Sequence, residues 1–153
     1  MDEAIAAYRK VIELQPDYGP ALCNLAWLLA TCADSKLRDP RQALELAKKG
    51  LEKEPQSACF WQILGWAHYR SGDWKASIEA LEKSMASQKR PKEGDSYQWF
   101  FLAMAHWQLR NNQEARNWYD RAVEWMNKNQ PKNQELRRFR AEAAELLGVR
   151  EKK

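Results

Sequence analysis

The chain repeats itself with a spacing of 38 residues. A shift of this length superimposes Trp61 on Trp99 and His68 on His106. The other pairs brought into register are mostly apolar or small: Leu64 with Leu102, Ala67 with Ala105, Ser77 with Ala115, Leu81 with Tyr119, and Ser84 with Ala122. A period of this length is typical of arrays in which each unit is one supersecondary element. We therefore expect similar units that stack on one another.

The residues within each unit predict α-helices. Apolar and small residues recur three or four positions apart, and helix formers dominate, whereas Gly and Pro number only 6 each. Pro16 and Pro55 are expected to end helices because proline cannot continue one. Asp39 and Pro40 predict an N-cap followed by proline at the first helical position. We expect helices at residues 2–15, 19–32, 40–53, 57–71, 74–88, 95–110, 112–128 and 133–147, with a break at 91–94.

The clearest unit carries a recognisable motif. It reads Trp61, Leu64, Gly65, His68, Ser77, Leu81 and Ser84. This sequence resembles the tetratricopeptide repeat (TPR), in which Trp-x2-Leu-Gly-x2-Tyr on one helix precedes Ala-x3-Phe on an antiparallel partner. Further copies begin at Leu22 and Trp99. The resemblance covers roughly residues 2–130. It implies an all-α, right-handed α-solenoid of helix-turn-helix repeats with a C-terminal capping helix.

The resemblance also implies a domain organisation. We expect a single TPR domain over residues 1–153, made of a half repeat with the second helix only (1–18), a repeat with a longer inter-helix loop (19–57), two further repeats (58–95 and 96–130), and a capping helix with a tail (131–153). Because the chain begins within a repeat, we expect helix 2–15 to have an apolar face without its natural partner. The repeats further resemble TPR arrays of large bacterial multidomain proteins, although no residue indicates a kinase or other attached domain.

Charge and hydropathy argue against several classes of function. The formal net charge is +4, and acidic and basic residues alternate as on solvated helix faces. An RNA-binding solenoid would need basic residues among aromatic ones on the inner helices. The inner helices offer Arg70 and Arg110 but few other basic residues, so we expect no nucleic-acid partner. No apolar run is long enough for a membrane span, and no signal peptide is visible. Three cysteines form an odd, unpatterned set, which favours a reducing compartment and a cytoplasmic location.

No pattern of catalytic or metal-binding residues is present in the sequence. Phosphate-binding glycine loops and the Gly-x-Ser-x-Gly elbow are absent. His68 and His106 occupy the same place in successive repeats, so we interpret them as packing residues rather than ligands of one metal. Cys23 and Cys59 lie near the same face of neighbouring inner helices, but no second pair completes a tetrahedral site. We expect no enzyme activity, cofactor or metal.

The resemblance implies a binding surface on the first helix of each repeat, which lines the concave side of a TPR array. The repeat places the following residues there: Cys23, Asn24, Trp27, Gln62, Trp66, Tyr69, Arg70, Tyr97, Phe100, Met104, Trp107 and Gln108. Half of them are large apolar side chains at positions that the repeat's own core does not require. A contiguous apolar patch of this composition marks an interaction surface. The alternative is that some of these side chains thicken the core.

The same positions constrain the ligand. A TPR subclass grips the C-terminal carboxylate of peptides with Lys, Asn and Arg; Asn24 fits that set, but Cys59, Gln62, Tyr97 and Phe100 stand where basic residues would be needed. A peptide or partner domain with an apolar or proline-containing segment fits the aromatic residues better. We therefore predict a non-catalytic protein-interaction scaffold. The alternative is a structural module that forms homo-oligomers through this groove or through helix 2–15.

Overall fold

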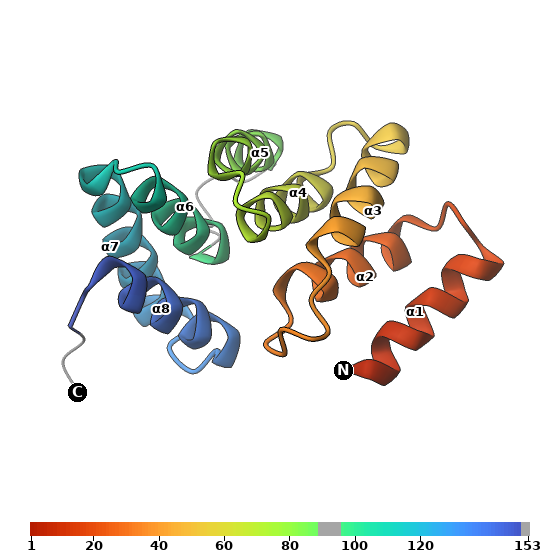
Figure 1. The fold of residues 1–153 in the computed structure, drawn as a ribbon, viewed down its shortest axis with the longest axis horizontal. Coiled ribbons are helices and arrows are strands. Elements are labelled where there is room, and N and C mark those ends of the chain that lie inside the picture. The colour runs from red at the N-terminus through yellow and green to blue at the C-terminus, as the bar shows by residue number, and fades with distance from the viewer. Residues whose placement is uncertain (89–95, 151–153) are drawn as a thin grey trace. The chain divides into compact units, whose positions relative to one another are not determined.

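The computed structural model describes residues 1–88 and 96–150, and within them the chain forms eight α-helices and no strand (Figure 1). The helices are α1 (Asp2–Leu14), α2 (Gly19–Thr31), α3 (Pro40–Lys53), α4 (Ala58–Arg70), α5 (Trp74–Ser87), α6 (Ser96–Gln108), α7 (Asn112–Asn129) and α8 (Gln134–Leu147). The all-α fold class is confirmed, and each helix ends within two residues of its predicted bounds. The predicted break at 91–94 lies outside the described residues.

The chain divides into two compact units, Met1–Lys89 and Arg90–Lys153. In the first unit, which contains α1 to α5, each helix packs on the next and α2 also packs on α4. In the second unit α6 packs on α7 and on α8, and α7 packs on α8. We call α2, α4, α6 and α8 the inner helices, because within a unit each contacts the equivalent helix of the neighbouring hairpin. The outer helices are α3, α5 and α7.

Small residues allow neighbouring helices to cross closely. A Cβ atom added at Gly65 of α4 would lie 2.5 Å from the Cγ atom of Leu81 in α5. At Gly50 of α3 an added Cβ would collide with the ring of Phe60 in α4. Side chains therefore interlock only because these two positions are glycine. The small landmark positions of the repeat thus act in packing, as the sequence predicts.

Side-chain caps start two of the outer helices, α3 and α5. Asp39 accepts a hydrogen bond of 3.0 Å from the backbone nitrogen of Gln42, and Pro40 follows as the first residue of α3. Asp73 accepts a bond of 3.1 Å from the backbone nitrogen of Ala76 at the start of α5. Each cap satisfies one backbone N–H that has no partner inside the helix. The predicted N-cap at Asp39 is confirmed.

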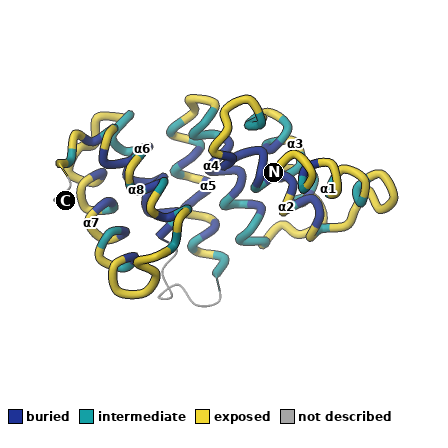
Figure 2. Tube along the Cα trace, turned by 90° about the horizontal axis from the view of Figure 1, so that it is seen from below, coloured by how far each residue is buried: buried dark blue, intermediate teal, exposed yellow. Residues whose placement is uncertain are grey.

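Burial differs between the helices of the first unit. Figure 2 shows most of α2 and the middle of α4 buried, whereas α1 is largely exposed. Of the residues of α1, Ile5 alone is buried. The side chains of Leu14 and Tyr18 are 74% and 47% exposed. Helix α1 therefore leaves the apolar side chain of Leu14 accessible at its end, and the half repeat stays a prediction.

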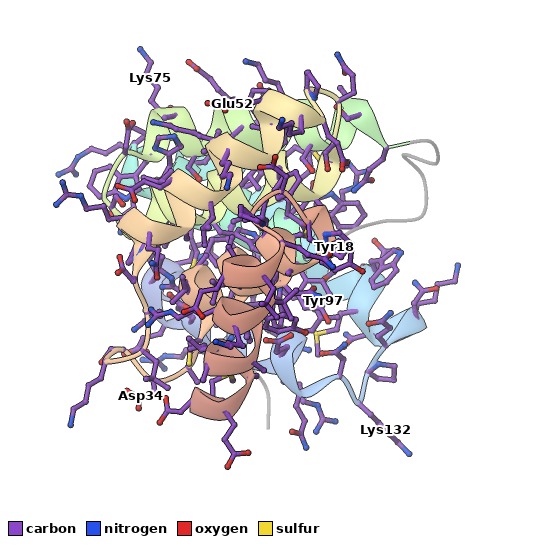
Figure 3. All side chains as sticks on the ribbon, turned by 90° about the vertical axis from the view of Figure 1, so that its right-hand side faces the viewer. Tyr18, Asp34, Glu52, Lys75, Tyr97 and Lys132 are labelled. Atoms are coloured by element: carbon purple, nitrogen blue, oxygen red, sulfur yellow. A yellow bond between two sulfur atoms is a disulfide. The ribbon has the colours of Figure 1, made fainter. Side chains whose placement is uncertain are left out.

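The outer helices carry the solvated charges. Figure 3 shows Glu52 of α3 and Lys75 of α5 extending away from the ribbon, and both residues are exposed. Alternating charges on these helices therefore keep their outer faces in water. None of the helices that the structure describes is both long and apolar enough to cross a bilayer.

Candidate functional site

Seven of the predicted binding residues lie on two neighbouring helices of the first unit. Helices α2 and α4 pack side by side, and we define the α2–α4 face as the surface to which the repeat assigns Cys23, Asn24, Trp27, Gln62, Trp66, Tyr69 and Arg70. On α4 these residues follow a spacing of three or four positions, which keeps them on one side of the helix. The first unit therefore offers a two-helix surface without any contribution from the second.

A disulfide joins the two helices on this face. Cys23 of α2 and Cys59 of α4 are bonded, with their Cα atoms 6.8 Å apart. Both are half-buried, whereas the third cysteine, Cys32, is free and 3% exposed. The expectation of three reduced, unpatterned cysteines is wrong, because equivalent faces of neighbouring inner helices bring two of them within bonding distance. The cysteine argument for a cytoplasmic location therefore fails, and that location stays a prediction.

The α2–α4 face is less apolar at its surface than the sequence predicts. Trp66 is 2% exposed, so its placement in a solvent-facing row is wrong. Trp27 and Tyr69 are half-buried and retain an accessible part of their rings. Asn24 is exposed, and the guanidinium carbon of Arg70 lies 5.7 Å from the centre of the Tyr69 ring. Gln62 is half-buried on the same side of α4. The accessible surface thus combines two aromatic rings with three polar side chains.

Two predicted binding residues of the second unit lie in its core. Phe100 and Met104 are both 0% exposed. The Phe100 ring packs edge-on against Tyr119 of α7, with ring centres 6.0 Å apart. The prediction that these two side chains face solvent is therefore wrong. Helix spacing gives the direction of a side chain but does not reveal which neighbouring helix covers it.

The remaining predicted residues of the second unit are half-buried. Tyr97 packs edge-on against Phe139 of α8, and its hydroxyl oxygen accepts a hydrogen bond of 2.7 Å from Asn133 Nδ2. These contacts hold α8 on α6, so Tyr97 has a structural role. Trp107 and Gln108 end α6 and remain partly accessible.

The two histidines lie at equivalent turns between inner and outer helices. His68 Nδ1 is 3.9 Å from an Asp73 carboxylate oxygen, and His106 Nδ1 is 3.5 Å from Asn111 Nδ2. Burial lowers the pKa of His68, the Asp73 carboxylate opposes this effect, and Lys48 adds to it. Within residues 1–88 and 96–150, no group of three or more His, Cys, Asp or Glu side chains is placed to hold a metal ion. Each histidine thus contacts a residue of its own turn.

A second group of aromatic residues lies mainly on the outer helix α7, and the predicted binding surface, which was confined to inner helices, did not include it. The guanidinium carbon of Arg121 lies 4.3 Å from the Trp99 ring centre and 5.3 Å from that of Trp118. Trp125 packs edge-on against Trp99 at 6.5 Å. We call Trp99, Trp118, Arg121 and Trp125 the Trp–Arg cluster. Trp118, Arg121 and Trp125 recur at positions three and four apart on α7, a spacing that was visible in the sequence.

Comparisons with known proteins agree with this geometry. Three family models, each described as a tetratricopeptide repeat, match residues 32–93, 7–45 and 99–129. The chain is a tetratricopeptide repeat protein. Two solved structures, described as crystal structures of MamA protein and of MamA, resemble this TPR chain in fold, each with 23% sequence identity over 97% of its length. They have TM-scores of 0.62 and 0.64, and the match covers 74% and 85% of their own chains. No curated protein matches the TPR chain in sequence.

Proposed function

We propose that the chain is a non-catalytic scaffold that binds a segment of a partner protein on the α2–α4 face. TPR repeats are generally interaction scaffolds without catalytic activity, which supports the coarse assignment. The proposal places the contact on the first unit, where two neighbouring inner helices expose aromatic and polar groups together. The Trp27 and Tyr69 rings supply apolar contact area at low entropic cost.

The observation that carries the proposal is the disulfide between the two helices that carry these rings. The Cys23–Cys59 bond fixes α2 against α4 on the face where Trp27 and Tyr69 are accessible. A surface whose backbone is already held loses less conformational freedom when a ligand binds. An apolar patch on a braced pair of helices is thus suited to repeated, reversible binding. An affinity in the micromolar range, about −8 kcal/mol, is expected for such a transient contact.

The ligand that suits this face is an extended apolar or proline-containing segment. Proline rings and aliphatic side chains pack on aromatic faces, here those of Trp27 and Tyr69. An extended peptide also leaves backbone N–H and C=O groups that need partners. Asn24 and Gln62 each offer an amide that donates and accepts hydrogen bonds. Aromatic and amide groups on one face therefore match both parts of such a peptide.

Fluorescence anisotropy with labelled peptides tests this proposal. The probe is a peptide of Pro-Pro-Leu repeats, and its counterpart carries Gly for every Pro and Ser for every Leu. We expect only the first to bind, and Trp27→Ala to weaken it by about 30-fold, the equivalent of roughly 2 kcal/mol at a hot spot. Tyr69→Ala should act similarly, whereas Tyr69→Phe keeps the ring and most of the affinity.

Tyr18→Ala provides the matched control. It also removes an accessible tyrosine, but one at the start of α2, outside the α2–α4 face. Thermal melts of every variant show whether the fold is intact. Equal weakening by Tyr18→Ala and Tyr69→Ala, or equal binding of both peptides, would contradict the proposed site.

Self-association is a second candidate, favoured by the exposure of α1. Leu14 and Tyr18 are 74% and 47% exposed, and Met1 is 60% exposed. Such side chains at one end of a stack could pack on another copy. Light scattering would then give twice the 17.9 kDa mass of the chain, and Leu14→Glu would restore the monomer. A dimer abolished by Trp27→Ala instead would place the second copy on the α2–α4 face.

A further inference from the structure

We propose that the Trp–Arg cluster of the second unit forms a separate docking site for an acidic peptide segment of a partner protein. Its carboxylates would pair with Arg121 and Lys128, and an apolar side chain would pack on Trp125. This site lies on α6 and α7 of the second unit, whereas the binding proposed above uses α2 and α4 of the first. An experiment can therefore contradict one of the two proposals without affecting the other.

The cluster borders an open pocket on the surface of the second unit. A pocket of about 350 Å³ is lined by Trp99, Arg121, Glu124, Trp125, Lys128 and Asn129, all from the second unit. Of these lining residues, Trp99 is 5% exposed, while Trp125 is half-buried and keeps part of its ring accessible. Asn129 Nδ2 donates a hydrogen bond of 2.9 Å to the Trp125 carbonyl oxygen, which ties down the end of α7. The pocket thus has room for one or two peptide side chains.

Comparison of the two units shows that the fold does not require these tryptophans. The contact of Arg121 with Trp99 has a counterpart in the first unit, where Lys83 Nζ lies 4.5 Å from the Trp61 ring centre. The shift of 38 residues that relates these pairs aligns Trp118 with Ala80 and Trp125 with Ser87. Because α5 folds with Ala and Ser there, the two tryptophans of α7 are additions to the repeat. Ala80 is 3% exposed and Ser87 is half-buried, so Trp125 is the addition that lies nearer the helix surface, where large aromatic side chains are characteristic of binding hot spots.

The charges of the pocket indicate an anionic ligand. In the part of the chain that the structure describes, neither Arg121 nor Lys128 forms an ion pair with a carboxylate. The Arg121 guanidinium lies against the Trp99 and Trp118 rings, which hold its planar fork of N–H donors in place. A fork held in this way is suited to a two-point hydrogen bond with a carboxylate. Two cations beside an accessible indole therefore match an acidic residue next to an apolar one.

The same pocket suits a peptide better than a nucleic-acid strand. Arg121 already covers the Trp99 ring, which removes one stacking face from any base. Glu124 lines the pocket and would repel a phosphate at every nucleotide step. In a peptide, the acidic side chains can be placed at Arg121 and Lys128 while a backbone N–H donates to Glu124. The mixed charge of the site therefore favours a peptide whose carboxylates are spaced apart.

Binding of defined probes to the full chain tests the proposal, in the Trp27→Ala, Tyr69→Ala background that removes the first face. The probes are a labelled peptide of Glu-Leu-Glu repeats, its Gln-Leu-Gln counterpart, and oligouridylate. We expect the Glu peptide to bind, the Gln counterpart to bind at least tenfold more weakly, and the difference to shrink at high salt. Equal binding of both peptides, or tighter binding of oligouridylate, would overturn the proposal.

Variants that copy the first unit locate the site. Trp125→Ser and Trp118→Ala introduce the residues that α5 carries at the same places, so the fold should persist, as thermal melts would show. We expect Trp125→Ser and Arg121→Gln each to weaken the Glu peptide at least tenfold. Lys83→Gln removes the matching cation of the first unit and should leave the affinity unchanged. Wild-type affinity in Trp125→Ser, or equal losses in Lys83→Gln and Arg121→Gln, would show that binding is not at the cluster.

Discussion

Ser77 Oγ donates a hydrogen bond of 2.7 Å to the carbonyl oxygen of Gly65, at the point where α5 crosses α4. The two residues thus act as a pair. Glycine lets the helices approach, and serine satisfies a second lone pair on the carbonyl oxygen at the contact. The family motif has alanine at the position of Ser77, so here a polar contact replaces a purely steric one. The stability of this hairpin depends on the absence of a side chain at Gly65.

The first prediction concerns that close approach. Gly65→Ala should lower the free energy of unfolding by about 1–3 kcal/mol, because its Cβ would meet Leu81 at 2.5 Å in a packed core. This loss opposes the gain in helix propensity that alanine normally brings. Denaturant unfolding followed by circular dichroism measures it. Gly19→Ala is the control, since its Cβ would meet only the mobile end of Glu54, at 3.1 Å. An unchanged or raised midpoint for Gly65→Ala would contradict the packing described.

The second prediction concerns Trp66. Because this side chain is 2% exposed, Trp66→Ala should cost about 3–5 kcal/mol of folding free energy. Trp27→Ala, at the equivalent repeat position but half-buried, should cost clearly less. Thermal or denaturant unfolding of the two variants side by side decides the matter. Similar stability of both variants would mean that Trp66 contributes to the surface rather than to the core.

The difference between these tryptophans shows what sequence reasoning could and could not predict. Helix bounds follow from local signals, such as Pro16, Pro55 and the Asp39 cap, and the hairpins follow from the repeat motif. The face on which Trp66, Phe100 and Met104 lie follows from spacing. Their burial does not follow, because it depends on helices that spacing cannot place.

Contacts between residues of separate helices could also not be predicted from the sequence. Cys23 and Cys59 could be assigned to one face, but a bond between them requires the 6.8 Å separation of their Cα atoms, which only the packing of α2 on α4 sets. The Trp–Arg cluster had a signal that was not used: the shift of 38 residues aligns Trp125 with Ser87. A departure between repeats at an outer position carries functional information that the shared motif does not.

The third prediction concerns the disulfide. The bond closes a loop with a sequence separation of 36, so reduction should destabilise the protein by up to about 4 kcal/mol if chain entropy dominates. Thermal unfolding with and without dithiothreitol measures this effect. The Cys23→Ser, Cys59→Ser variant should melt at the lower temperature under both conditions, while Cys32→Ala should keep the response to reductant. Melting of the wild type at one temperature in both buffers would show that the bond makes no contribution to stability.

The last prediction concerns pH and His68. Burial lowers its pKa from the ordinary value of about 6.5, so the unfolded chain binds the proton more readily than the folded one. The free energy of unfolding should therefore fall as the pH drops below about 7, and this loss should continue until the pH passes the lowered pKa of the folded state. Glu135 has the opposite effect at more acidic pH, because burial raises its pKa and protonation then favours the folded chain.

Denaturant unfolding at a series of pH values between about 8 and 6 separates the effect of His68 on stability from that of Glu135, which acts at more acidic pH. His68→Gln should flatten the dependence on pH in this window, because the side chain can no longer bind a proton in the unfolded state. His106→Gln removes the imidazole from the equivalent turn of the second unit and controls for the loss of a turn contact, since it leaves His68 in place. If the free energy of unfolding depends on pH as steeply in His68→Gln as in the wild type, other groups cause the dependence. The environment of His68 would then disfavour its charged form too weakly to affect folding.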